Sequence, residues 1–438
     1  MMRSITPILL AATTLAAPSQ LLSPQPKYST WMANSIITRN LSSPATRYYD
    51  QATFYRSLEA IVVAHQNSSN SSSFSPYLSH ITTQIDSLLH PNGTFISWDY
   101  NDHQLDNIRV ASSILFLYTS IPPSNTPQRT KYKAALDFLY DQLVNKQKRN
   151  PEGGFWHKDP KYPNQMWLDG LYMAQPFYAA YTSLFLSSMS PNSVNVNTTA
   201  AVADKNWDDI LLQFSLIEAH CRNATSGLLK HGYDASKTAI WADPITGASP
   251  LTWIRAQGWY LMALIDVLDY FPLSHPAYSQ LIKWARQLAR ALKETQDPET
   301  GGWWLVMDGE YGGPKGRERG NYVESSGSVM YVYGLLKGVR KWYLLDDGGE
   351  LVKVARRGYE GLVERFVRVV KGKDGEDGED GREVLLNWEG TVRVGSLDGR
   401  GDFEYYTGIN RVENSLIGVG PFILASVEYE MLTAAIET

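Results

Sequence analysis

The sequence of 438 residues contains a single cysteine, Cys221. One cysteine cannot form an intramolecular disulfide or a cysteine-ligated metal site, so both are excluded. The chain also lacks a His-Glu-x-x-His zinc motif, a phosphate loop of the Walker type and a nucleophile elbow. Zinc-peptidase, nucleotide-hydrolase and esterase functions therefore have no support, and we expect neither a metal nor a cofactor.

An excess of positive charge is also missing. The formal net charge is −5 at pH 7 and the isoelectric point is near 5.9. Proteins that bind nucleic acid usually carry a basic patch, so we expect no nucleic-acid partner. If the substrate is an anion, the attraction must come from a few cations placed locally.

The only marked apolar run lies at the N-terminus, where residues 5–17 follow Arg3. This run is too short for a membrane span and ends in small residues, so we predict a signal peptide over residues 1–17 and no membrane association. The chain would then be secreted and extracellular. Acceptor sequons for N-glycosylation agree with this prediction and lie at Asn40, Asn67, Asn70, Asn92, Asn197 and Asn223.

A linker rich in proline, glycine and serine, which would divide the chain into halves, is absent as well. We expect a leader segment over residues 18–45 and one catalytic domain over residues 46–438, acting as a monomer. Residues 371–383 are a low-complexity acidic stretch that predicts a mobile insertion. The 13 Trp, 26 Tyr and 13 Phe residues suffice for a large core and for aromatic rings along a groove.

A structural unit recurs along the chain. A short segment marked by glycine or tryptophan leads through a polar loop to a helix rich in small and apolar residues, and an amphipathic helix follows. The helices of this pattern begin near residues 105, 169, 254, 324 and 413. Each unit needs neighbours to bury its apolar face, so the pattern predicts an all-α (α/α)6 barrel with short β pieces in the loops at one mouth.

Asp169 is the first candidate for catalysis. It is surrounded in sequence by Trp167, Tyr172, Met173 and Phe177, with no cation nearby. Burial without a cation raises the pKa of a carboxyl group toward the range of a general acid or base. The alternative is that Asp169 only caps the helix that follows it.

The predicted barrel brings further polar residues to the same mouth, namely Asp106, His231, Arg255, Glu324 and Glu413. Paired carboxylates with aromatic walls are typical of glycosidase sites. Trp253 and Arg255 together suit an anionic sugar, because a guanidinium binds a carboxylate while an indole stacks on a ring. Arg255 could equally bind loop carbonyls or Glu324, and His231 could be structural; His157, after Trp156, is a weaker candidate.

Six ordered motifs resemble the unsaturated rhamnogalacturonyl hydrolases of glycoside hydrolase family 105. They are residues 105–108, 166–173, 230–234, 253–259, 324–327 and 403–406. The resemblance implies an (α/α)6 barrel that removes the 4,5-unsaturated uronic acid left by polysaccharide lyases. It further implies that C4 of the sugar is protonated, that water adds at C5, and that the resulting hemiketal opens and expels the rest of the chain.

The resemblance also implies residue roles. Asp169 matches the family's general acid and base, and Asp106 matches its second essential aspartate. The positions that match the lining of the sugar pocket are His231, Arg255, Trp253, Trp259, Trp167 and, loosely, His157. The chain has Ala256-Gln257 where Gly-Asn is frequent in the family, which leaves the fine specificity open.

Three alternatives remain at this point. The first is an unsaturated glucuronyl substrate, from ulvan or glycosaminoglycans, in place of unsaturated galacturonyl-rhamnose from pectic rhamnogalacturonan. The second is a conventional (α/α)6 glycosidase or sugar epimerase. The third is a sugar-binding protein without catalysis. The pair of Asp106 and Asp169 argues against it, because binding alone does not require an unpaired carboxylate in an aromatic pocket.

Overall fold

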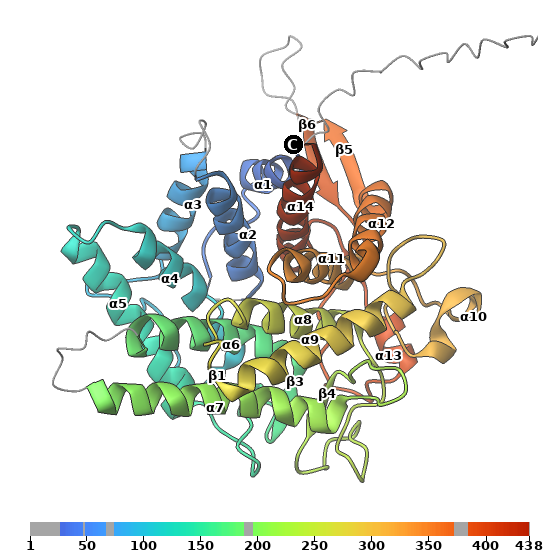
Figure 1. The fold of residues 1–438 in the computed structure, drawn as a ribbon, viewed down its shortest axis with the longest axis horizontal. Helices are drawn as coiled ribbons and strands as arrows, with labels where there is room; N and C mark the ends of the chain where they lie inside the picture. The colour runs from blue at the N-terminus through green and yellow to red at the C-terminus, as the bar shows by residue number, and fades with distance from the viewer. Residues whose placement is uncertain (1–26, 47–48, 67–73, 188–195, 372–383, 438) are drawn as a thin grey trace, which may run out of the picture.

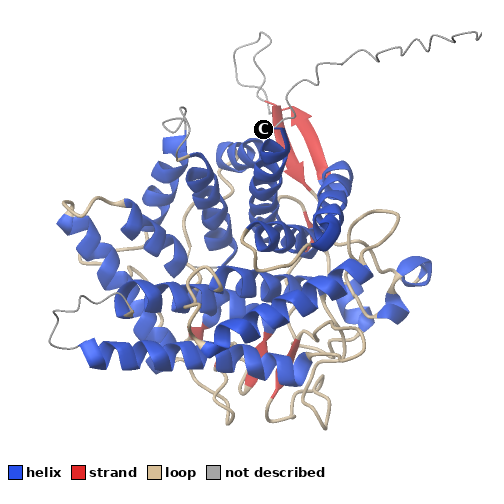
Figure 2. Ribbon diagram, in the orientation of Figure 1, coloured by secondary structure: helices blue, strands red, loops and turns tan. Residues whose placement is uncertain are grey.

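The computed structural model describes residues 27–46, 49–66, 74–187, 196–371 and 384–437. The predicted signal peptide, most of the acidic insertion and the sequons at Asn67 and Asn70 lie outside these residues. Helices dominate and the strands are short (Figure 2). The all-α class and the (α/α)6 barrel predicted from the sequence are confirmed.

Six helices of the described chain form an inner ring in which each helix contacts the next and the last contacts the first (Figure 1). Helix α8 is rich in apolar residues and every one of its residues is buried, whereas α2 also carries Asp50, Arg56 and Glu59. A helix that is apolar all round must be buried, here within the ring of its neighbours. The inner helices are α2 (Tyr49–His65), α4 (Ala111–Ser120), α6 (Leu168–Tyr181), α8 (Ile254–Val267), α11 (Ser325–Arg340) and α14 (Leu416–Glu437).

An outer helix packs against each inner helix. In α9 the buried residues recur at helical spacing and the charged ones face outward, as expected for an amphipathic helix. The outer helices are α1 (Tyr28–Thr38), α3 (Ser75–Asp86), α5 (Thr126–Asp141), α7 (Val196–Cys221), α9 (Pro276–Thr295) and α12 (Glu350–Phe366).

Helix α1 differs from the expectation, because residues 18–45 were assigned to a leader ahead of the fold. Met32, Ala33 and Ile36 of α1 are completely buried, and the helix packs on α14 and α2. Ser29 also donates a hydrogen bond of 2.7 Å to Glu430, near the other end of the chain. Helix α1 is therefore the outer partner of α14 and completes the sixth hairpin.

The short strands pair in antiparallel twos. Three of the pairs lie in loops that connect helices at one mouth, as the sequence predicted. The pairs are β1 (His103–Gln104) with β2 (Lys158–Asp159), β3 (Gln165–Trp167) with β4 (Gly232–Asp234), β5 (Val367–Lys371) with β6 (Val384–Trp388), and β7 (Thr391–Val392) with β8 (Arg411–Val412). The β5–β6 hairpin instead projects beside α12 and α14 (Figure 1).

Short helical turns complete the loops. They are η2 (Leu105–Ile108), η3 (Gln142–Lys146), η4 (Thr182–Leu186), η5 (Gly309–Tyr311), α10 (Gly313–Glu318), η6 (Asp347–Gly349) and α13 (Phe403–Thr407). The turns η2 and α13 matter most here, because each places a residue of the candidate site.

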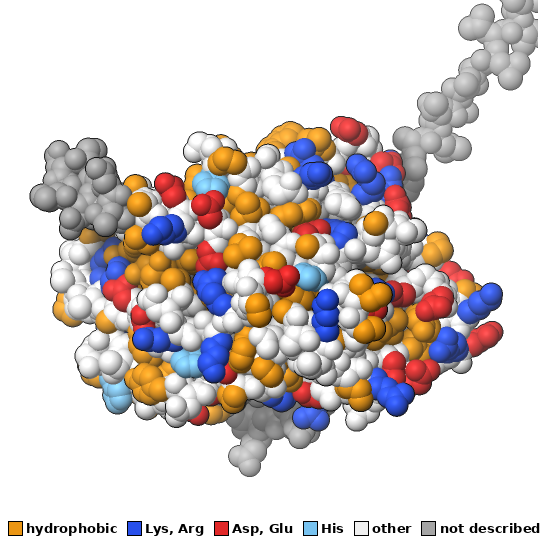
Figure 3. All heavy atoms as spheres, turned by 90° about the horizontal axis from the view of Figure 1, so that it is seen from below, with side chains coloured by type: hydrophobic (Ala, Val, Ile, Leu, Met, Phe, Trp, Pro, Cys, Tyr) orange, Lys and Arg blue, Asp and Glu red, His pale blue; other side chains and the backbone are white. Residues whose placement is uncertain are grey.

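Helix α14 is long and apolar enough to cross a membrane, which the sequence analysis had not anticipated for any later segment. Its position explains the composition, since α14 packs between α2 and α11 and 72% of its most apolar window is buried. On the face that Figure 3 shows, acidic and basic side chains are interspersed.

Candidate active site

All six inner helices begin at the same mouth of the barrel, where a pocket of about 410 Å³ lies. The polypeptide enters each inner helix through a loop, so residues at the helix starts face one another there. The residues lining the pocket are Tyr49, Asp50, Asp106, His157, Lys158, Trp167, Asp169, Met173, Trp253, Arg255, Arg393, Val394, Gly395, Ser396, Val412, Ser415 and Ile417. Six of the eight predicted site residues are among them.

Asp169 is the second residue of α6 and contacts His231. Its Oδ2 lies 3.1 Å from Nε2 of the histidine. The β3–β4 pair creates this contact: Trp167 is opposite Gly232, and the amide of Leu168 donates to the carbonyl of His231 at 3.0 Å. A Cβ on Gly232 would lie 2.6 Å from the carbonyl oxygen of Met166, so the strands approach this closely only with glycine there.

The pKa of Asp169 is lower than its usual value, contrary to the prediction that it would be raised. Burial does favour the neutral form, as predicted. The charge and hydrogen bond of His231, with a smaller effect of His157, outweigh burial. Asp169 is therefore ionised at rest, and a proton must reach it before it can act as an acid.

Asp106, on η2, forms an ion pair of 2.6 Å with Lys158. Burial disfavours the charge on Lys158, but Asp106 outweighs it and raises the pKa of Lys158 above its usual value. The ammonium is consequently charged, and its side chain is 21% exposed toward the pocket. A cation is thus available for an anionic substrate.

His157 lies between the two carboxylates and is fully buried. Nε2 of His157 is 3.9 Å from Asp106 Oδ1, and its ring stacks on Trp167 with centroids 4.4 Å apart. Burial lowers the pKa of His157 to about 4, against the opposing effect of Asp106. His157 is therefore neutral at physiological pH.

The predicted tryptophans occupy different depths. Trp167 and Trp253 line the pocket but are only 4% and 1% exposed, and their rings stack on His157 and Tyr406, respectively. Trp259 lies outside the pocket lining. It stacks on Tyr172 at 4.9 Å and meets Tyr49 edge-on at 6.2 Å, so it supports the wall from behind.

Arg255 lines the pocket, yet most of its donors are used within the protein. One terminal nitrogen donates to the carbonyl of Val392 at 2.5 Å and to the Ser326 hydroxyl at 3.3 Å, and the other donates to the carbonyl of Arg393. Of the roles considered from the sequence, binding loop carbonyls is the one that the contacts show. Arg255 fixes the strand that leads into the wall residues 393–396.

Glu324 and Glu413 do not line the pocket. Glu324 is the N-cap of α11: it accepts from the amide of Gly327 at 2.7 Å and, through its other oxygen, from the amide of Val392 at 3.0 Å. Glu413 is exposed. The structure therefore gives Glu324 a capping role and leaves Asp106 and Asp169 as carboxylates of the pocket.

Several site residues were not singled out from the sequence. Lys158 directly follows His157, and pairing of a lysine with Asp106 had no sequence signal. Tyr49 and Asp50 begin α2, and burial raises the pKa of Asp50. Arg393 is exposed at the pocket and adds a second accessible cation.

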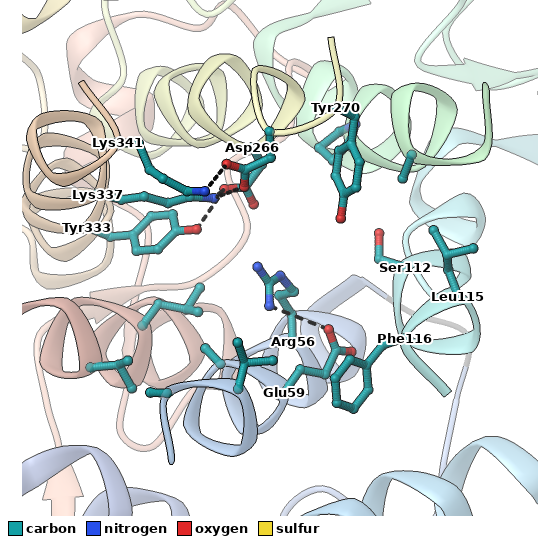
Figure 4. Close-up of a pocket in the computed structure, with 18 of the residues that line it drawn as sticks. Arg56, Glu59, Ser112, Leu115, Phe116, Asp266, Tyr270, Tyr333, Lys337 and Lys341 are labelled. Carbon is teal, nitrogen blue, oxygen red and sulfur yellow. Dashed lines mark hydrogen bonds and ion pairs between the residues drawn. The ribbon is translucent and has the colours of Figure 1, made fainter. Parts of the chain in front are cut away.

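A larger hollow of about 620 Å³ lies at the opposite mouth, lined by the later halves of the inner helices (Figure 4). Its charged residues pair with one another: Lys337 binds Asp266 and Asp269 at 2.6 Å each, and Arg56 lies 3.6 Å from Glu59. Cations are favourable at helix C-termini, which accounts for the lysines and arginines. None of the predicted site residues lines this hollow.

Comparison with known proteins identifies the family. The model of Glycosyl Hydrolase Family 88 matches residues 28–433. The chain belongs to this family. It is a glycoside hydrolase. A solved family 105 glycoside hydrolase from C. acetobutylicum ATCC 824 is 34% identical in sequence and superposes with a TM-score of 0.77, over 93% of this chain and all of that one.

Two further relatives extend the comparison. Protein Atu3128 of Agrobacterium fabrum is 31% identical over 227 residues, which is 51% of this chain and 91% of the relative. The unsaturated glucuronyl hydrolase of Bacillus sp. GL1 is 15% identical with a TM-score of 0.51, over 92% of this chain and 95% of that one. At that identity the likeness shows the fold alone.

Proposed function

We propose that this glycoside hydrolase removes a 4,5-unsaturated uronic acid from the non-reducing end of oligosaccharides produced by lyases, with unsaturated galacturonyl-rhamnose as its substrate. The observation that carries the proposal is the pocket itself. Asp169, held by His231, and Lys158, held by Asp106, face one cavity beside Trp167. This arrangement joins a proton-transferring carboxylate to a cation for the uronate.

The proposed reaction begins at the double bond. Asp169 gives a proton to C4, and the π electrons of C4–C5 form the new C–H bond. The positive charge then rests on C5 and the ring oxygen. Asp169, ionised again, takes a proton from water as the water oxygen bonds to C5. The hemiketal opens and releases the remaining sugar, so no bond from the sugar to the enzyme is required.

The charges of the pocket suit this substrate. Its lining contains three carboxylates, Asp50, Asp106 and Asp169, and three cations, Lys158, Arg255 and Arg393. Since Arg255 is engaged with backbone carbonyls, we assign the uronate carboxylate to Lys158, with Arg393 nearby. Local cations thereby offset the repulsion expected from a protein of net charge −5.

A substrate comparison tests the proposal. The protein is incubated with unsaturated galacturonyl-rhamnose, with the matching unsaturated glucuronyl disaccharides and with a saturated disaccharide, and products are separated chromatographically. We expect cleavage of the first. Cleavage of the glucuronyl compound alone would select an unsaturated glucuronyl hydrolase, the second candidate. Cleavage of the saturated sugar alone would select a conventional glycosidase.

We also propose that the enzyme acts outside the cell as a monomer. The support is the apolar N-terminal run and the sequons, of which Asn40, Asn92 and Asn223 lie in described segments. Expression of the full chain in a eukaryotic host should yield protein in the medium that shifts in mass on deglycosylation. Retention inside the cell would contradict secretion, and light scattering would report the oligomeric state.

A further inference from the structure

Tyr406 extends the contact between Asp169 and His231 into a chain of three groups. The hydroxyl of Tyr406 lies 2.8 Å from Nδ1 of His231, and Nε2 of the same ring lies 3.1 Å from Asp169. His231 and Tyr406 are both completely buried. Tyr406 comes from α13, His231 directly precedes β4, and Asp169 belongs to α6. These hydrogen bonds therefore form only when the mouth of the barrel is folded.

We infer that His231 supplies the proton that Asp169 passes to the substrate, and that Tyr406 positions His231 by keeping its ring hydrogen-bonded in both protonation states. This inference rests on the proposed function. Asp169 is ionised at rest because its pKa is lowered, so it needs a hydrogen-bonded proton donor before it can protonate the substrate. His231 is the one titratable group with a hydrogen bond to Asp169 among the described residues.

The hydroxyl oxygen of Tyr406 suits this role because it can accept from an N–H. When Nε2 gives its proton to Asp169, the remaining ring proton stays on Nδ1, so Tyr406 accepts from Nδ1 in the charged and in the neutral state of the ring. Burial raises the pKa of Tyr406 well above its usual value, so the hydroxyl stays neutral throughout.

The proton balance closes over one turnover. The Nε2–H bond of a doubly protonated His231 breaks as an O–H bond forms on Asp169. That proton then bonds to C4. After water adds to C5, Asp169 takes the water proton and returns it to His231, so the enzyme regains its resting state and one water is consumed.

Few other titratable groups lie near Tyr406, His231 and Asp169. His157 is near both His231 and Asp169 but is neutral, as its low pKa shows. Tyr405, Asp308 and Asp402 approach from the side of Tyr406, and Tyr49 lies near Asp169. Burial raises the pKa of both Tyr405 and Tyr49. Asp308 is paired with Lys230 at 2.5 Å. The rings of Trp253 and Trp167 cover His231 at 4.8 and 5.4 Å and carry no charge. The pH response should therefore report His231 and Asp169 as a pair.

Tyr406→Phe tests the inference, since it removes the hydroxyl and leaves the ring that stacks on Trp253 at 5.7 Å. We expect kcat to fall about tenfold or more. KM should change little, because Tyr406 does not line the pocket. The alkaline limb of the kcat/KM profile should move to lower pH, because an unpartnered charged N–H costs more than an unpartnered neutral one.

Tyr429→Phe is the matched control. It removes a tyrosine hydroxyl that donates to Glu360 at 2.7 Å on the outside of the barrel, so both kinetic constants and the pH profile should stay those of the wild type. An unchanged kcat and profile in Tyr406→Phe would overturn the inference. So would a lower kcat with an unchanged profile, because that result indicates a structural role.

A second measurement is made on the wild-type protein and does not depend on the folding of Tyr406→Phe. Ring resonances of His231 in the wild-type protein, assigned by their loss in His231→Gln, are followed by NMR against pH. We expect His231 to gain and lose a proton over the pH range in which activity falls. A ring that keeps one protonation state across that range would overturn the inference. Failure of the wild type to cleave any unsaturated uronide would instead overturn the proposed function.

Discussion

Replacing Arg255 by lysine separates two roles for this residue. The guanidinium holds the carbonyls of Val392 and Arg393 through two different nitrogens and also reaches Ser326. A lysine ammonium keeps the charge but lacks the planar fork, so it can satisfy only part of this set. The residue is 1% exposed and Val392 is completely buried, so bulk water could not replace the donor to the Val392 carbonyl.

The expected loss of stability follows from these contacts. A hydrogen bond from a charged donor contributes about 1.5 to 3 kcal/mol, so the loss of one such bond lowers the free energy of unfolding by about 2 kcal/mol. The wall formed by residues 393–396 should also become less ordered and reduce kcat/KM. If Arg255 served only the substrate, stability without substrate would not change.

The assay is thermal or denaturant unfolding of Arg255→Lys without substrate, together with its steady-state kinetics. Arg340→Lys is the matched control, because Arg340 also makes two bonds, both of 2.6 Å, to Glu428 at the opposite mouth. The control should lose some stability and keep its KM. Wild-type stability in Arg255→Lys would refute the role of Arg255 in holding the wall.

Three further predictions follow from the site. Asp169→Asn should abolish turnover and keep the fold. Asp208→Asn, on the outer helix α7 with a side chain 74% exposed, should keep both turnover and fold. Measurable turnover in a folded Asp169→Asn would exclude its acid and base role. Lys158→Ala should raise KM about tenfold by removing one charge-assisted contact, and an unchanged KM would place the uronate elsewhere. The pKa of His157 is about 4 in the folded protein and 6.5 in the unfolded chain. Between these values the unfolded chain binds a proton at this residue and the folded protein does not. The free energy of unfolding should therefore fall by about 3 kcal/mol as the pH drops from 6.5 to 4. His157→Gln should flatten that part of the stability profile measured by denaturant unfolding, and an unaltered slope would contradict the assignment.

The barrel could be predicted because its signal is repeated. Inner helices such as α6 and α8 are buried nearly all round and outer helices such as α9 on one side, and a closed ring buries both kinds. Helix α1 was missed because Tyr28–Thr38 follows a stretch rich in proline and serine and lies far in sequence from α14, the helix that buries it. A short helix that is stabilised by a helix at the other end of the chain shows few helical signals in its own sequence.

The site was predicted by residue type and position, but its pairings were not. Asp169 and Asp106 reach the pocket as expected, since Asp169 begins the inner helix α6 and Asp106 lies on η2, just before the inner helix α4. Their partners could not be foreseen: His231 meets Asp169 only through the register of β3 and β4, and Lys158 meets Asp106 across a loop. The predicted direction for the pKa of Asp169 was wrong because the sequence did not show that His231 would contact it.

The central claim is that the enzyme protonates the C4–C5 double bond through Asp169. The most direct test runs the reaction of unsaturated galacturonyl-rhamnose in D₂O, following the ultraviolet absorbance of the conjugated double bond, the release of rhamnose and the deuterium at C4 by NMR. Absorbance loss should not lag behind rhamnose release, and one deuterium should occupy one configuration at C4. Rhamnose released ahead of the absorbance loss, or deuterium spread over both configurations, would contradict the claim.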